Sequence, residues 1–155
     1  MKIYLAGPDV FAPDAIQRGM RLKELCAKYG FEGLYPLDNE CANAREIFQA
    51  NLELIRQSDI IMANINDFRG HGIDDGTAFE IGVGYALYKK LYCYRNGSST
   101  LRERIGTTDI NGYTVEDFGL PVNLMIGVPT HIIYGSVEDC LKAIRFWQNN
   151  VISVN

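Results

Sequence analysis

A run of glycines and carboxylates in the middle of the chain holds the residue types best suited to chemistry. In FRGHGIDDGTAFEIGVG (68–84), Asp74 and Asp75 precede an apolar helical pattern, and Glu80 falls in its opening turns. Two carboxyl groups beside one cleft can divide the cleavage of a glycosidic bond, because one attacks the anomeric carbon while the other handles the leaving group's proton. The same acids could instead complement the helix dipole, with Glu80 as a solvated helix residue. The pattern alone leaves both interpretations open.

Other chemistries have little support in the sequence. The chain has no G-x-G-x-x-G between a strand and a helix, no Walker-type GK[ST] and no GxSxG, which disfavours dinucleotide, nucleoside-triphosphate and serine-nucleophile sites. The four cysteines lie far apart without CxxC spacing, and the two histidines have no partners at metal-site spacing. We therefore expect reduced thiols, no metal and no organic cofactor.

Length and composition predict a single globular domain over residues 1–155. Hydrophobic residues make up 47% and charged residues 22% of the chain, which is ordinary globular usage. The net charge of -4 and the lack of a basic run disfavour nucleic acid as a partner. No apolar run reaches the roughly 18 residues of a membrane helix. The N-terminus lacks the pattern of a signal peptide, so we expect no membrane partner and a cytoplasmic location.

Strand and helix patterns alternate along the chain. Short apolar runs predict strands at 2–6, 31–35, 59–65, 91–95 and 130–135, and helical periodicity predicts helices at 15–29, 44–57, 77–89 and 137–150, with a short capped helix at 98–106 beginning at Ser98 or Ser99. The connections are too long for hairpins. This order predicts a doubly wound, flavodoxin-like α/β fold, an open parallel sheet of about five strands with helices on both faces. Ligands of such sheets bind beyond the carboxyl ends of the strands.

Several side chains near that edge have two interpretations each. Tyr4 lies in the middle of the first predicted strand, where its buried hydroxyl needs a partner. The partner could be a backbone carbonyl or a catalytic carboxylate. Asp59 could cap or pair locally at the start of its strand. Phe11, Phe68 and Met125 could belong to the core or form the walls of a base-stacking slot.

Four segments together resemble the nucleoside 2-deoxyribosyltransferase family. They are KIYLAGPDVF at 2–11, YPLDNE at 35–40, NLELIRQSDIIMANINDFRGHGIDDGTAFEIG at 51–82 and GLPVNLM at 119–125, and together they extend over most of the chain. The D-x-G-T-x-x-E core is the most specific part. The resemblance implies the same α/β fold and an enzyme of nucleoside salvage. Such an enzyme would cleave the N-glycosidic bond of a 2'-deoxynucleoside, hold the deoxyribosyl group on a glutamate, and transfer it with retention to a free purine or pyrimidine base.

The resemblance also implies roles for residues that match the family's motifs. Glu80 would be the nucleophile, and Tyr4 would orient it. Asp74 would handle the proton on the base, with Asp59 supporting Asp74 or the base edge. The nucleoside pocket would be lined by Gly7, Phe11, Phe68, Gly76 and Met125. Asn123 would bind the 5' end of the sugar in a neighbouring subunit's site, because family sites are shared between protomers of a homo-oligomer.

Two alternative functions stay open in the sequence, and one family feature is missing from it. A hydrolase of 2'-deoxynucleosides or their 5'-monophosphates would share much of this pattern; the SST run at 98–100 and Arg69 could hold a phosphate, whereas Asn123 favours a nucleoside. A non-catalytic nucleotide-binding or receiver-like module would need an aspartate at the carboxyl end of the third strand, where Asn64 stands. Some relatives place a C-terminal aromatic carboxylate in the neighbour's site, but residues 151–155 include no aromatic residue.

Overall fold

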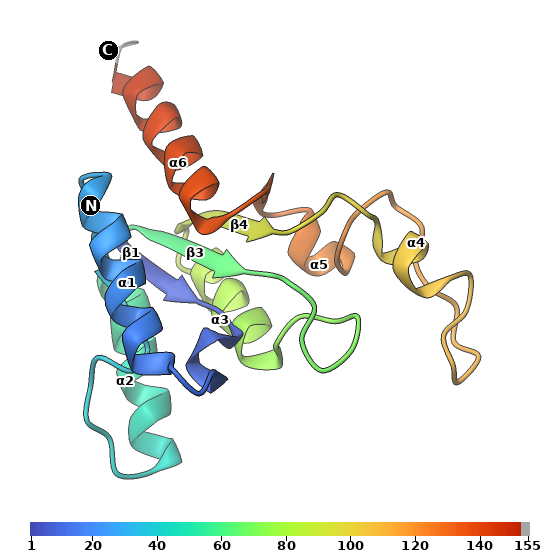
Figure 1. Cartoon of the computed structure of the whole chain (residues 1–155), viewed down its shortest axis with the longest axis horizontal. Coiled ribbons are helices and arrows are strands. Elements are labelled where there is room, and N and C mark those ends of the chain that lie inside the picture. Colours follow the sequence, from blue (N-terminus) through green and yellow to red (C-terminus); the bar gives the residue numbers. More distant parts are fainter. Residues whose placement is uncertain (153–155) are drawn as a thin grey trace.

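The structure is a single five-stranded parallel sheet with helices on both faces (Figure 1). It is a computed structural model that describes residues 1–152, with side chains as far as residue 150. The strands are β1 (Lys2–Ala6), β2 (Glu32–Leu34), β3 (Ile60–Asn64), β4 (Lys90–Arg95) and β5 (His131–Tyr134), in the order β2-β1-β3-β4-β5. This topology confirms the predicted doubly wound, flavodoxin-like fold.

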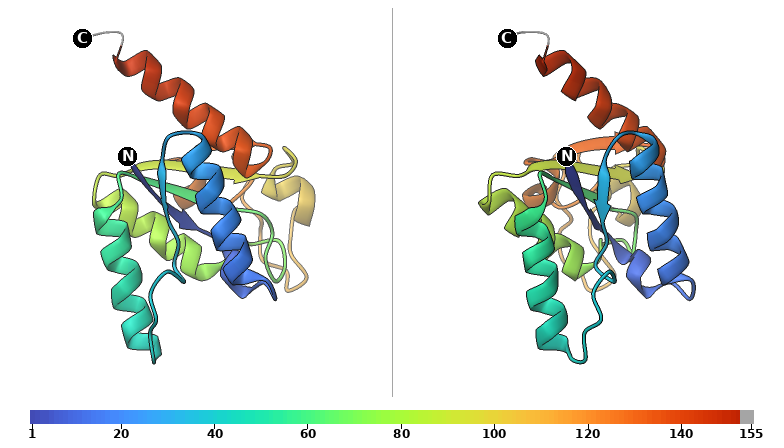
Figure 2. Two further views of the ribbon diagram at one scale, coloured as in Figure 1. Left: turned by 60° about the vertical axis from the view of Figure 1, so that its left-hand side comes forward. Right: turned by 90° about the vertical axis from the view of Figure 1, so that its left-hand side faces the viewer.

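The helices form two layers around the sheet (Figure 2). One face carries α1 (Ala15–Lys28) and α6 (Val137–Ile152), and the other carries α2 (Ala44–Gln57), α3 (Asp75–Ala86) and the short α5 (Leu124–Gly127). The far end of α6 projects beyond the sheet (Figures 1 and 2). Because both faces are covered, the central strands are apolar throughout rather than alternating.

Alternation of side chains along β1 divides the core between the two faces. Ile3 and Leu5 point into the core beneath α1 and α6, whereas Tyr4 and Ala6 point into the core beneath α2 and α3. Tyr4 pairs in register with Ile61 of β3 and is completely buried. The register of β1 therefore presents the Tyr4 hydroxyl to the layer that contains α3.

Helix α3 begins and ends earlier than the sequence predicted. Asp74 is its N-cap, since Asp74 Oδ2 accepts hydrogen bonds from Thr77 N at 2.8 Å and from Thr77 Oγ1 at 2.9 Å. The helix ends at Ala86, and Tyr88 takes a left-handed conformation (φ 56°) directly after it. Gly84 lets the helix lie close to β3, because a Cβ there would be 2.6 Å from Ile61 Cγ1. This close packing fixes the last turn of α3, one turn after Glu80, against the sheet.

The chain between β4 and β5 extends away from the sheet (Figure 1) and contains α4 (Leu101–Ile105). The predicted start of this helix at Ser98 or Ser99 is wrong. Thr100 is the N-cap and forms a capping box with Glu103, a pairing that satisfies two free amides at the helix start. Arg104 donates to Pro121 O within the segment at 2.7 Å and ties the segment to the loop after β3 by pairing with Asp67 at 3.3 Å.

Candidate active site

Tyr4 and Glu80 form the centre of the site. The Tyr4 hydroxyl donates a hydrogen bond to Glu80 Oε1 at 2.5 Å, which joins the middle of β1 to the second turn of α3. Tyr4 has no exposed surface, and Glu80 is partly buried at the edge of a cavity. Glu80 is therefore not a solvated helix residue, and no cationic side chain among residues 1–150 pairs with it.

The environment of Glu80 favours its neutral form. The pKa of Glu80 is raised from 4.5 to about 7, chiefly by burial; the hydrogen bond from Tyr4 lowers it, and the negative charge of Asp74 adds a smaller upward shift. Burial and the nearby Glu80 charge also raise the pKa of Tyr4, so its hydroxyl remains a donor. A carboxyl group with a pKa near neutrality is typical of sites that do chemistry.

Asp74 lies in the same cavity wall as Glu80 and has a structural task as well. Its Oδ2 caps α3 through Thr77, and its Oδ1 accepts no hydrogen bond from the described residues. Asp74 is therefore the N-cap of α3, in keeping with one of the two interpretations that the sequence left open. The cap leaves one carboxylate oxygen available to a ligand.

The cavity beside Glu80 has a volume of about 290 Å³ and mostly apolar walls. It is lined by Gly7, Val10, Phe11, Pro36, Leu37, Ile47, Asn51, Asp74, Gly76 and Glu80. An adjoining hollow between α2 and α3 shares Ile47, Asn51 and Glu80 with it. Gly7 is required at its position, because a Cβ there would be 2.8 Å from the Cβ of Asn64. A small apolar cavity with a few convergent polar groups is the usual form of a ligand site.

One wall of the cavity is backed by stacked aromatic rings. Phe11 of the 3-10 helix η1 (Pro8–Phe11) lines the cavity, and its ring stacks on Phe68 with centroids 5.4 Å apart and planes at 20°. The Arg69 guanidinium lies 5.2 Å from the Phe11 ring and 4.7 Å from the Phe68 ring. Phe68 therefore supports Phe11 rather than lining the cavity itself.

Asp59 is not brought to this site, and the role suggested for it beside Asp74 is corrected here. It directly precedes β3, so it lies at the amino edge of the sheet, where its Oδ2 accepts a hydrogen bond from Lys2 N at 2.7 Å. The cavity opens at the opposite, carboxyl edge. Asp59 holds β1 and β3 together at their starts.

Asn123 and Met125 also lie outside the cavity of their own chain. Asn123 caps α5 by accepting from Met125 N at 3.0 Å, and it donates to Glu116 Oε2 at 3.1 Å. Met125 is 73% exposed. Their predicted contribution to a neighbouring subunit's site stays a prediction.

Asn51 is the polar cavity residue that sequence reasoning missed, along with the apolar wall residues Val10, Pro36, Leu37 and Ile47. It lines both hollows beside Glu80, and its buried Oδ1 has no hydrogen-bond partner among the described residues. A signal was present in the sequence, since Asn51 lies one turn from both Ile47 and Ile55 on the otherwise apolar side of α2. A buried, unpaired amide that faces a cavity is suited to contacting a polar ligand.

Comparison with known proteins then gives the family. The model of the family described as nucleoside 2-deoxyribosyltransferase matches residues 3–125. The chain belongs to this family. The matched range contains every residue of the site described above, from Tyr4 to Glu80, and the segment around Asn123.

Solved structures of the family and of related folds agree with the architecture. A 2-desoxiribosyltransferase from Leishmania mexicana is 34% identical, with a TM-score of 0.86 over 94% of this chain and 97% of that one. Two more distant structures share the fold. One is a 2-deoxyribosyltransferase from Bacillus psychrosaccharolyticus, which is 23% identical with a TM-score of 0.58 over 90% of this chain and 89% of that one. The other is a CMP N-glycosidase from Clostridium botulinum, which is 16% identical with a TM-score of 0.56 over 95% of this chain and 99% of that one.

A curated relative is known only as an uncharacterised protein of Schizosaccharomyces pombe. It is 28% identical over 113 residues, a match that covers 66% of this chain and 54% of that protein. The chain therefore spans about half the length of that relative.

Three further expectations concern metals, membranes and the C-terminus. No cluster of three or more His, Cys, Asp or Glu side chains within residues 1–150 has a geometry that could hold a metal ion. No helix in the described part of the chain has the length and hydropathy needed to cross a membrane. Residues 153–155, on which the prediction about a C-terminal contact partly falls, lie outside the described residues.

Proposed function

We propose that this chain transfers 2-deoxyribose between nucleobases in nucleoside salvage, through a covalent deoxyribosyl intermediate on Glu80 and with retention of configuration. The observation that carries the proposal is the Tyr4–Glu80 hydrogen bond of 2.5 Å at the edge of an apolar cavity that also contains Asp74. Family membership supports the reaction class, and the geometry supports the assignment of roles.

In the first half of the reaction, the ionised Glu80 carboxylate attacks C1' of the deoxynucleoside while the bond from C1' to the base nitrogen breaks. Near neutral pH the two carboxyl groups share one proton, in keeping with the raised pKa of Glu80, and in the reactive form this proton is on Asp74. Asp74 donates it to a ring nitrogen, so the base leaves as a neutral molecule and Asp74 becomes a carboxylate. The sugar lacks a 2'-hydroxyl that would withdraw electrons, which makes its oxocarbenium-like transition state comparatively accessible. Tyr4 holds Oε1, which leaves Oε2 for the attack.

In the second half, a ring nitrogen of the incoming base attacks C1' from the face that the first base left. The C1'–O bond to Glu80 breaks, Glu80 returns to the carboxylate form, and Asp74 accepts the proton of the incoming base. The carbon is inverted twice, so the product keeps the configuration of the substrate. No metal or redox partner is needed to balance either step.

The cavity offers separate surfaces to the base. Phe11, supported by Phe68 and Arg69, presents an aromatic face on which a base can stack. The unpaired Oδ1 of Asn51 is placed to contact the base edge, the task that Asp59 cannot perform from the amino edge of the sheet.

A neighbouring protomer completes the site in this proposal. Phe48 and Phe79, whose rings lie 5.9 Å apart, are 46% and 51% exposed beside the cavity, and Ile47 is 43% exposed. An exposed apolar surface of this kind is typical of an interface between subunits. Asn123 and the exposed Met125 of a second copy would cover the cavity mouth and contact the sugar.

The test is incubation of the purified protein with deoxyinosine, with and without adenine, followed by chromatography. Deoxyadenosine that forms only with adenine supports transfer, whereas free deoxyribose in both samples indicates a hydrolase. A parallel incubation uses deoxyinosine 5'-monophosphate. Cleavage of the monophosphate alone would indicate a nucleotide hydrolase, and no turnover of either substrate would favour a binding module. In the same assay we expect Asn51→Ala to lose activity and Asp59→Asn to match the wild type.

A further inference from the structure

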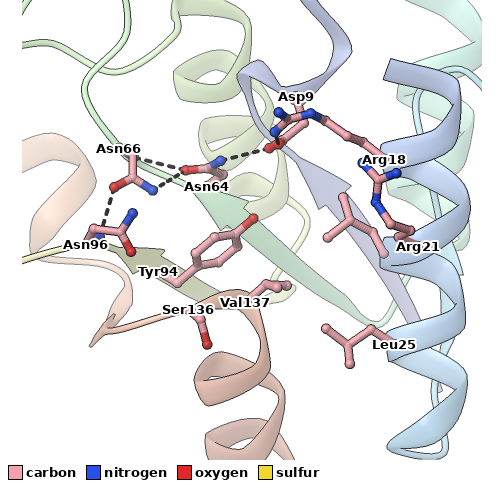
Figure 3. Close-up of a pocket in the computed structure, with 11 residues that line it drawn as sticks. Asp9, Arg18, Arg21, Leu25, Asn64, Asn66, Tyr94, Asn96, Ser136 and Val137 are labelled. Carbon is pink, nitrogen blue, oxygen red and sulfur yellow. Dashed lines mark hydrogen bonds and ion pairs between the residues drawn. The ribbon is translucent and has the colours of Figure 1, made fainter. Parts of the chain in front are cut away.

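A second cavity lies on the opposite face of the sheet and takes no part in the proposed reaction. It has a volume of about 380 Å³ and lies between the middle of α1, the carboxyl ends of β3 and β4, and the start of α6 (Figure 3). Tyr94 at its base belongs to the core beneath α1 and α6, whereas Tyr4 belongs to the core beneath α2 and α3. The sheet therefore separates this cavity from Glu80.

A chain of hydrogen bonds fixes the polar side chains along one rim. Asn64 Nδ2 donates to Asp9 Oδ2 at 2.8 Å, Asn66 Nδ2 donates to Asn64 Oδ1 at 2.7 Å, and Asn96 N donates to Asn66 Oδ1 at 2.8 Å (Figure 3). The side-chain amide of Asn96 forms no hydrogen bond with the described residues. The side-chain amides of Asn64 and Asn66 are held in place before any ligand arrives, and the exposed side chain of Asn96 retains both a donor and an acceptor.

Tyr94 supplies a second, independent observation. The residue is only 9% exposed, its hydroxyl points into the cavity (Figure 3), and the hydroxyl makes no hydrogen bond within the described part of the chain. Burial raises the pKa of Tyr94, so the hydroxyl stays a neutral donor. The hydroxyl oxygen is open to the cavity and has no protein partner, so it is free to donate to a ligand there.

The charges around the cavity cancel one another. Arg18 pairs with Asp9 at 3.2 Å and with Asp14 at 2.7 Å, and Arg21 pairs with Asp14 at 2.7 Å. Two guanidinium groups therefore face two carboxylates, which leaves no net charge to attract a phosphate or a cation. Apart from Ser136, the remaining wall residues are apolar: Leu22, Leu25 and Val137.

We propose that this cavity is a second ligand site, which binds a neutral, flat heterocycle with hydrogen-bond donors and acceptors on its edge, such as a free nucleobase. The apolar wall residues would contact the faces of the heterocycle. The side-chain amides of Asn64, Asn66 and Asn96 would form hydrogen bonds with its edge, and the Tyr94 hydroxyl would donate a hydrogen bond to it from the base of the cavity. The volume falls within the roughly 300–1,000 Å³ of small-molecule sites. The argument depends on this cavity alone and not on the reaction at Glu80.

Titration of the wild-type protein with adenine, followed by the side-chain amide signals of asparagine in nitrogen-15 NMR, tests the proposal. We expect the signals of Asn66 and Asn96 to shift and saturate, separately from the signal of Asn51 in the catalytic cavity. Shifts confined to Asn51, or no shifts up to the solubility limit of adenine, would overturn it. Deoxyinosine turnover, measured in parallel, reports independently on the proposed reaction.

Paired variants test which groups bind the ligand. Tyr94→Phe with Asn96→Ala should weaken the adenine affinity measured at the Asn66 signal by about tenfold or more, since each lost hydrogen bond to a neutral ligand is worth roughly 0.5–1.5 kcal/mol. The matched pair Tyr113→Phe with Asn111→Ala, on an exposed loop remote from the cavity, should leave that affinity unchanged. Equal affinities in the two pairs would overturn the proposal.

Discussion

The Tyr4 hydroxyl lies 2.5 Å from Glu80 Oε1, although 76 residues separate the two in sequence. The contact depends on two features of the fold. The register of β1 turns Tyr4 toward the layer that contains α3. Gly84 lets α3 lie close to β3, so that the Glu80 carboxylate reaches the Tyr4 hydroxyl. The hydrogen bond stabilises the ionised form of a carboxyl group whose burial favours the neutral form.

Removal of the Tyr4 hydroxyl tests whether it positions and tunes Glu80. Tyr4→Phe should lower kcat/KM for deoxyribosyl transfer on the order of 10²-fold, as loss of one preorganised donor does in other active sites. It should also move the acidic limb of the pH profile above its wild-type position near pH 7, because the hydrogen bond lowers the pKa of Glu80. Tyr113→Phe serves as the control. A lower kcat/KM with an unchanged acidic limb of the pH profile would show that Tyr4 contributes packing only and does not tune the pKa of Glu80.

The raised pKa of Glu80 makes the folded protein less stable as pH rises. The folded state binds the Glu80 proton up to about pH 7, whereas the unfolded chain releases it near 4.5, so stability is lost between these values. Glu80→Gln should therefore raise the free energy of unfolding by up to the order of 3 kcal/mol at pH 8 and by little at pH 4.5. Urea unfolding at both pH values measures this.

The control for that measurement is Glu24→Gln on the exposed side of α1, which should change stability by no more than about 0.5 kcal/mol at either pH. A Glu80→Gln protein that is no more stable than wild type at pH 8 would contradict the buried, partly neutral state described for this carboxyl.

Asp74 is the N-cap of α3 and the proposed proton donor to the base, and two substitutions distinguish these two roles. Asp74→Ser keeps an N-cap oxygen for Thr77 N but cannot protonate a base, so it should fold with near wild-type stability and lose most transfer activity. Asp74→Ala should lose the same activity and, in addition, about 0.5–2 kcal/mol of stability. Full activity in the serine variant would remove Asp74 from the chemistry and leave it a helix cap.

Sharing of sites between protomers predicts rescue by mixing. Glu80→Ala and Asn123→Ala should each be inactive alone. When they are unfolded and refolded together, one site of each mixed pair receives an intact Glu80 from one chain and an intact Asn123 from the other, and activity should return. Failure of the mixture to recover activity, with mixed oligomers shown by native mass spectrometry, would place Asn123 outside the site.

Much of the fold follows from local patterns. Apolar runs ended by glycine or proline, alternating with amphipathic stretches, were sufficient to predict all five strands and the parallel sheet. Helix starts were less predictable, since Ser98, Ser99 and Thr100 are all good caps, and only the reciprocal bond with Glu103 distinguishes Thr100.

The site was predictable only where side-chain direction follows from sequence position. Tyr4 in a buried strand and Glu80 on an apolar helix each needed a partner, and the family resemblance paired them. The position of Asp59 before β3 already placed it at the amino edge, away from the ligand end of a parallel sheet. Asn51 was missed because an amide within a helical stripe shows its lack of a partner only when the packing around it is known.

The most direct test of the account is intact-mass spectrometry of the protein after exposure to a 2-fluoro-2-deoxyribosyl nucleoside, which slows hydrolysis of a glycosyl ester. We predict a single covalent adduct per site that peptide mapping assigns to Glu80 and that disappears in Glu80→Gln. An adduct on Asp74, or turnover of the deoxynucleoside by the Glu80→Gln protein, would contradict Glu80 as the nucleophile.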